Sequence, residues 1–166
     1  MTGIELRPAT EADAEGIRNV ARAAWHAAYS SMLEGDRIDR TVESWYAPER
    51  LIEDDIAPDE RPLFVAVADG TVVGFAEAPP DGDDTGLAHL YRIYVDPDHW
   101  GQGIGRALLE RIQMTLRERN FERLTVSVHA DNEVGVAFYE AAGFERLGTA
   151  PDEAFGGERH EYRKRL

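Results

Sequence analysis

Three glycines at alternate positions join an extended segment to an amphipathic helix, and this junction restricts the fold more than any other feature. Residues Leu87–Val95 favour a strand, which Asp96-Pro97 ends. Gly101, Gly103 and Gly105 follow. The next segment carries its apolar side chains on one helical stripe, at Ile104, Leu108, Ile112 and Leu116. A strand, a glycine turn and a helix in this order predict an α/β or α+β layered domain.

The glycine turn also predicts a binding site made of main chain. Glycines let successive backbone N–H groups point toward one place, and the start of a helix adds partial positive charge, so a phosphate fits there. The turn is not a P-loop, because no Gly-Lys-Ser/Thr follows, and Arg106 stands where the dinucleotide fingerprint needs glycine. Two other interpretations stay open: a tight structural turn, and a generic nucleotide-binding domain that takes ATP or NAD.

Further strands and helices are predicted on both sides of this junction. Period-two patterns predict strands at Ile4–Pro8, Leu63–Ala68, Val72–Ala78, Leu124–Val128, Phe144–Thr149 and Glu158–Arg165. Asp69-Gly70 predicts a hairpin turn. Helices are expected after the capping pair Thr10 and Asp13, in pieces around Val42–Tyr46 and Glu49–Ile56, and from Asp131-Asn132 to Gly143.

Composition narrows the class of protein. The chain has 166 residues, which fits one domain over residues 1–166, and it has no cysteine, which excludes a disulfide framework and a cysteine nucleophile. No apolar run reaches the length of a membrane helix and the first residues lack a signal layout, so we expect a cytoplasmic protein.

The charge is strongly acidic. Lysine and arginine number 18 against 32 acidic residues, which gives a net charge of −14 and argues against nucleic acid and anionic membranes as partners. Lys164 is the only lysine. An acid excess with scarce lysine resembles proteins of salt-loving cells, where high ionic strength screens self-repulsion. An ordinary acidic protein is the alternative.

Two motifs resemble the signatures of one enzyme family. Val95–Leu109, which contains the glycine turn, resembles the acyl-CoA signature of the GNAT superfamily of N-acetyltransferases, and Asn132–Phe144 is similar to its second signature. The resemblance extends over nearly the whole chain and keeps the order of elements. One position departs from the family pattern: Trp100 stands where Gln or Arg is common.

The resemblance implies a fold and a cofactor site. The fold would be a GNAT-like mixed, mostly antiparallel sheet flanked by helices, with splayed central strands. Acetyl-CoA would lie between those strands, and no metal would be needed. The residues that match the family's cofactor site are Ile93, Tyr94, Val95, Gly101, Gln102, Gly103, Ile104, Gly105, Arg106, Asn132 and Tyr139.

The resemblance also implies a reaction. A primary amine of a small molecule or a peptide would attack the thioester directly, and Tyr139 would be the acid. His89, Glu77 or a water relay would be the base. Trp25 and Tyr29 would contact the acceptor, and closing strands of this kind often pair in a homodimer. A non-catalytic acyl-CoA-binding regulator of the same fold is the alternative function.

Overall fold

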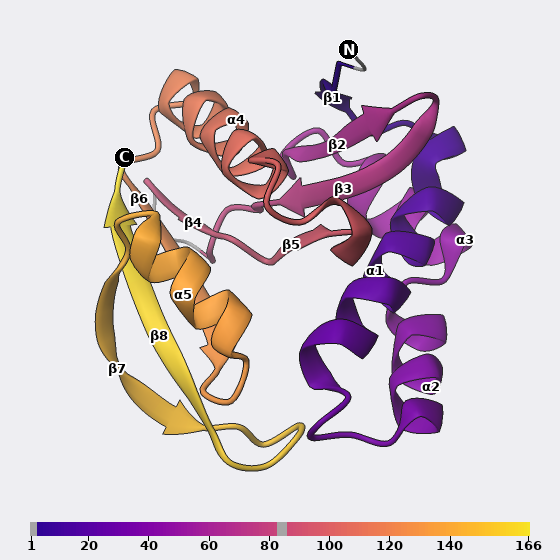
Figure 1. Ribbon diagram of the computed structural model, residues 1–166. Helices are drawn as coiled ribbons and strands as arrows, with labels where there is room; N and C mark the ends of the chain where they lie inside the picture. Colours follow the sequence, from indigo (N-terminus) through magenta and orange to yellow (C-terminus); the bar gives the residue numbers. More distant parts are fainter. Residues whose placement is uncertain (1–2, 83–85) are drawn as a thin grey trace.

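The computed structural model describes residues 3–82 and 86–166 and arranges them as two four-stranded sheets flanked by helices (Figure 1). The first sheet has the order β1-β2-β3-β5 and is antiparallel, while the second has the order β4-β6-β8-β7, with β4 parallel to β6. The strands are β1 (Glu5–Pro8), β2 (Leu63–Ala68), β3 (Thr71–Glu77), β4 (Leu87–His89), β5 (Arg92–Val95), β6 (Arg123–His129), β7 (Glu145–Pro151) and β8 (Glu158–Arg165). The predicted mixed, mostly antiparallel architecture is confirmed.

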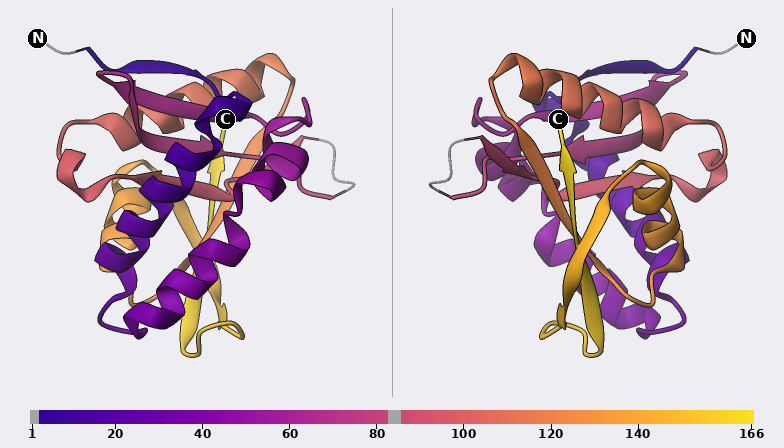
Figure 2. Two further views of the ribbon diagram at one scale, coloured as in Figure 1. Left: turned by 90° about the vertical axis from the view of Figure 1, so that its right-hand side faces the viewer. Right: turned by 90° about the vertical axis from the view of Figure 1, so that its left-hand side faces the viewer.

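Helices cover both faces of the first sheet. Helices α1 and α2 pack on one face and α4 on the other, while α5 lies against the second sheet (Figures 1 and 2). The helices are α1 (Ala14–Tyr29), α2 (Gly35–Trp45), α3 (Pro48–Arg50), α4 (Ile104–Glu118) and α5 (Glu133–Ala141), and a π-helix (Leu51–Ile56) continues α3. Within the described residues, no helix combines the length and apolarity that a bilayer span requires.

Strand β2 joins the two halves of the core because it is buried along its whole length. Side chains alternate across a strand. Val65 and the residues two positions before and after it therefore pack in the apolar cluster with α1 and α2. Ala66 and the residues two positions before and after it pack in the cluster with α4. The hairpin that follows is confirmed: Asp69 and Gly70 both have positive φ, 50° and 77°, as a two-residue hairpin turn of the primed type requires.

The predicted strand Leu87–Val95 is wrong in one respect, because the structure contains two strands there. The amide of Leu90 donates to the Thr125 carbonyl of the second sheet (2.7 Å), while the next amide, of Tyr91, donates to the Glu77 carbonyl of the first sheet (2.9 Å). Consecutive peptide groups are thus bonded to different sheets. The sheets diverge at Leu90–Tyr91, and a cleft opens between β5 and β6.

The caps at the helix ends agree with the sequence, but one helix is longer than predicted. The Asn132 Oδ1 accepts from the Gly135 amide (3.0 Å) at the start of α5, and Gly143 closes that helix with φ 92°. Helix α2 begins at Gly35 instead of near Val42. Only Ile38 and Val42 of α2 are buried, so its polar first turns carry little periodic signal.

Candidate active site

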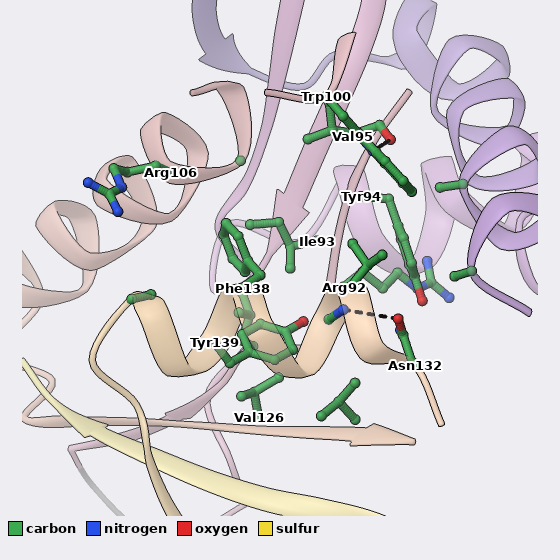
Figure 3. A pocket seen from close by; sticks show the side chains of 18 of the residues that line it. Arg92, Ile93, Tyr94, Val95, Trp100, Arg106, Val126, Asn132, Phe138 and Tyr139 are labelled. Atoms are coloured by element: carbon green, nitrogen blue, oxygen red, sulfur yellow. Dashed lines mark hydrogen bonds between the residues drawn. The ribbon is translucent and has the colours of Figure 1, made fainter. Parts of the chain in front are cut away.

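A cleft with a volume of about 430 Å³ lies where the two sheets diverge. Strand β5 and strand β6 form its two sides, and residues of α1, α4 and α5 complete it. Figure 3 shows Ile93, Val126 and Tyr139 in this space, with Trp100 near one end. Its narrow end is at Leu90 and the glycine turn lies at the other end.

One edge of β5 is free to pair with a ligand. The Asp96 amide donates to the Val73 carbonyl of β3 (2.8 Å), and backbone groups in an antiparallel pair alternate from residue to residue. The backbone groups of Ile93 and Val95 therefore point away from β3 and toward the cleft. An extended ligand with amide groups can bond there as an added strand.

Trp100 reaches back to this free edge. Its indole Nε1 donates to the Val95 carbonyl at 2.8 Å, and 41% of the side chain is exposed. The bond occupies the one carbonyl of Val95 and leaves its amide, and both groups of Ile93, directed at the cleft. Trp100, which stands where Gln or Arg is common in the family that the sequence resembles, thus forms part of the cleft wall.

The glycine turn presents main-chain donors at the wide end. Gly101 and Gly103 have left-handed φ values of 79° and 80°, and a Cβ at either position would meet nothing within 4 Å, so their backbone is strained for other residues but open to a ligand. In residues 3–82 and 86–166, no protein group accepts from the amides of residues 101–106. Gly105 serves packing, since a Cβ there would lie 3.1 Å from Phe138.

Three tyrosines line the cleft from different elements: Tyr29 of α1, Tyr94 of β5 and Tyr139 of α5. The Asn132 Nδ2 donates to the Tyr29 hydroxyl at 3.3 Å, which joins α5 to α1. Burial raises the pKa of Tyr29, Tyr94 and Tyr139 alike. The Tyr139 hydroxyl has no hydrogen-bond partner among the described residues, and in Figure 3 its ring lies between Ile93 and Val126. These phenols therefore stay protonated at neutral pH.

The structure brings most of the predicted site residues to this cleft. The residues that line it are Tyr29, Ile93, Tyr94, Val95, Gly101, Gly103, Ile104, Gly105, Arg106, Asn132 and Tyr139. Gln102 is exposed and does not line it. Trp25 is 4% exposed and packs behind Tyr29, with 4.8 Å between the ring centroids. His89 and Glu77 also lie outside the lining.

His89 lies on the second sheet, just before the point of divergence. Its Nδ1 is 2.9 Å from the Thr125 hydroxyl of β6. Burial lowers the pKa of His89 below its ordinary value, although nearby Asp81 and Glu161 act in the opposite direction. The imidazole is therefore neutral at pH 7. Ser127, two residues beyond Thr125, does line the cleft, and its hydroxyl bonds to Glu161.

Glu77 belongs to a cluster of two carboxylates and two guanidinium groups. Its Oε2 accepts from Arg61 Nε at 2.9 Å, and Arg61 also pairs with Asp55 at 3.2 Å. Arg92 lies 3.6 Å from Asp55 and 3.8 Å from Glu77. Burial, together with the neighbouring Asp55, raises the pKa of Glu77 to about 7.

Sequence reasoning missed the partners of Glu77. Asp55, Arg61 and Arg92 come from the π-helix, the following loop and the first residue of β5. No local spacing in the sequence connects these segments. Asp55 also lies in one of several acidic segments, so composition does not single it out. Only the position of Glu77 at the end of an apolar strand, β3, hints at a buried and paired charge.

Comparison with known proteins identifies the family. A family model described as Acetyltransferase (GNAT) family matches residues 22–144. The chain belongs to this family.

Several relatives are named acetyltransferases. A mycothiol acetyltransferase of Rhodococcus jostii (strain RHA1) is 32% identical over 143 residues, which cover 84% of this chain but 44% of the relative. The chain thus spans about half the length of the mycothiol acetyltransferases that it matches. A spermidine N(1)-acetyltransferase of Thermoplasma acidophilum is 28% identical over 144 residues, which cover 85% of this chain and 88% of the relative.

Solved structures agree on the fold. The PaiA N-acetyltransferase of Thermoplasma acidophilum, in complex with coenzyme A, superposes with a TM-score of 0.87. It is 24% identical, and the match covers 99% of each chain. A putative GNAT-family acetyltransferase from Desulfovibrio desulfuricans gives a TM-score of 0.74 at 20% identity, again over 99% of each chain. At these identities the likeness supports the GNAT fold.

Proposed function

We propose that this protein is an N-acetyltransferase that moves the acetyl group of acetyl-CoA to a primary amine. The free edge of β5, which leads from the narrow end of the cleft to the glycine turn, is the observation that carries this proposal. Membership of the GNAT family and relatives named acetyltransferases support it. A coenzyme A complex of a structure with the same fold supports the choice of donor.

We assign two parts of coenzyme A to two features of the cleft. The pyrophosphate is assigned to the open amides of residues 101–106, beside the Arg106 guanidinium. The pantetheine arm is assigned to the free edge at Ile93 and the Val95 amide, in the manner of an added strand. Bound acetyl-CoA supplies an acetyl thioester that an amine can attack directly, and the chain contains no cysteine to serve as a covalent carrier.

Tyr139 is our candidate acid. Burial, with Tyr29 close by, raises its pKa, so the phenol carries its proton at neutral pH. Its hydroxyl is directed into the cleft and has no acceptor within residues 3–82 and 86–166, which leaves it free to donate to a leaving thiolate.

His89 is our candidate base, with Glu77 and a water relay as the alternatives. We expect His89→Ala to remove the acid limb of the kcat/KM profile, because the neutral imidazole protonates as the pH falls below its lowered pKa. Steady-state rates between pH 5 and pH 9 measure this. His160→Ala, which changes a histidine of β8 that lies 3.1 Å from the Thr149 hydroxyl of β7, is the control. If the acid limb of the kcat/KM profile remains in His89→Ala, His89 is not the base, and Glu77 or a water relay takes that role.

Thiol release from acetyl-CoA tests the proposed function. The assay takes a panel of polyamines, amino acids, aminoglycosides and peptides with free termini, in molar KCl, and the absence of cysteine gives a clean background. We expect release with one class of amine. If no amine of the panel causes thiol release while acetyl-CoA still binds, the result contradicts the proposed acetyl transfer. It then favours the non-catalytic acyl-CoA-binding regulator.

We also propose that the protein works in the cytoplasm of a salt-rich cell, which its net charge of −14 and single lysine support. Screening of acidic self-repulsion stabilises the folded state. We therefore expect the midpoint of thermal unfolding to rise by several degrees between dilute buffer and about 2 M KCl. A shift of this size corresponds to a stabilisation of about 1–2 kcal/mol for a chain of this length. Equal midpoints in both buffers contradict the proposal.

A further inference from the structure

A second, smaller pocket adjoins the narrow end of the cleft. Its volume is about 170 Å³, and it shares Tyr91 and Arg92 with the cleft. The residues that line it are Trp45, Arg50, Asp54, Asp55, Arg61, Tyr91 and Arg92. Because the free edge of β5 begins at Arg92, a ligand that pairs with this edge ends beside the pocket.

The floor of this pocket is electrically balanced. Asp55 and Glu77 face Arg61 and Arg92, so two carboxylates meet two guanidinium groups. Arg92 is further held between the rings of Tyr46 and Tyr91, at 4.3 Å and 4.5 Å. Glu77 is 1% exposed, and its Oε1 has no hydrogen-bond partner among the described residues, with the Arg92 guanidinium 3.8 Å away.

The rim of the pocket carries one charge of each sign. Arg50 donates to the Ser44 carbonyl at 3.2 Å, and no carboxylate of the described residues pairs with it. Asp54 is likewise without an ion pair in that part of the chain. Both residues are exposed, and the half-exposed Trp45 and Tyr91 rings lie on the same rim. The pocket therefore offers a guanidinium and a carboxylate on an aromatic rim.

We propose that this pocket binds the acceptor and that the acceptor is a small amine that also carries a carboxylate. This inference rests on the proposed function and narrows it. The amine lies toward Tyr91 and the cleft, while the carboxylate meets the guanidinium of Arg50, whose planar fork of donors suits a carboxylate. A polyamine suits the pocket less well, because its second ammonium would lie beside the Arg50 guanidinium, with which no carboxylate of the described residues pairs.

Matched acceptors test the inference by binding. Titration calorimetry on the protein saturated with coenzyme A compares amino acids with their own carboxamides, and includes spermidine. We expect the carboxylate form to bind about tenfold more tightly, as a charged hydrogen bond provides. Arg50→Ala should abolish this ratio, and Arg50→Lys should keep part of it. Arg40→Ala removes the same charge from α2 outside the pocket and should leave the ratio unchanged.

The outcomes separate this inference from the proposed function. A ratio near one, tighter binding of spermidine, or a ratio that survives in Arg50→Ala overturns the inference. Thiol release with polyamines alone overturns it too, while the proposed function stands. If no amine releases thiol, the proposed function fails, and the binding ratio still decides whether the pocket takes carboxylates. Arg50 is exposed, so Arg50→Ala is expected to fold, and circular dichroism checks this.

Discussion

Replacing Tyr139 by phenylalanine is expected to lower kcat by about 100-fold, the lower end of what a positioned general acid contributes. The affinity for acetyl-CoA should change by less than about twofold, because the aromatic ring and its contacts with Phe138 and Phe144 remain. The hydroxyl has no partner among the described residues, so its removal leaves no buried group unpaired. Thiol-release kinetics and titration of acetyl-CoA give the two quantities.

Tyr162→Phe is the matched control. Tyr162 is also buried and lies near Tyr139, with 6.3 Å between the ring centroids. Its hydroxyl, however, donates to Glu140 at 2.7 Å, away from the cleft. We expect kcat to stay within about twofold of the wild type. An unchanged kcat in Tyr139→Phe removes Tyr139 from proton transfer, and equal losses in both variants indicate a packing effect.

Replacing Glu77 by glutamine is expected to flatten the pH dependence of stability. Burial and Asp55 raise the pKa of Glu77 from about 4.5 to about 7 in the folded state, so the folded protein holds a proton that the unfolded chain releases. The resulting stabilisation is complete below pH 4.5 and is lost as the pH rises through 7. Glu77→Gln should remove a decrease of about 3 kcal/mol in the free energy of unfolding over this range.

Urea unfolding at fixed salt, from pH 4.5 to pH 8, measures this decrease. Glu53→Gln makes the same charge change at an exposed position of the π-helix and serves as the control. Its stability curve should run parallel to that of the wild type. Parallel curves for wild type and Glu77→Gln contradict the raised pKa. The glutamine keeps an oxygen for Arg61, so the variant retains that hydrogen bond.

Local sequence signals were sufficient for the elements that form the cleft. The Asp69-Gly70 turn, the Asn132 cap and the stripe from Ile104 to Leu116 each depend on residues close together in the chain. The glycine turn belongs to the same class, since its left-handed residues are required locally. Such features are set by backbone geometry and neighbouring side chains, and the structure places them as expected.

Features that depend on distant partners were not predictable. Periodicity cannot show that Leu87–Val95 changes sheets, because each half is apolar and extended, and only the partners Thr125 and Glu77 distinguish them. The two sheets therefore looked like one. The Asp55–Arg61–Arg92 cluster is similar, since three separate segments supply its charges. No fixed interval along the sequence relates these residues, so a motif search could not find the cluster.

The switch of sheets at Leu90–Tyr91 has a mechanical consequence. Two hydrogen bonds, of 2.7 Å and 2.9 Å, fix consecutive amides to opposite sheets. We therefore expect fluctuations in the separation of the sheets to be smallest at this end of the cleft and to grow toward the glycine turn. The reacting groups would be held at the stiffest point, while the nucleotide end would yield enough to admit and release a bulky ligand.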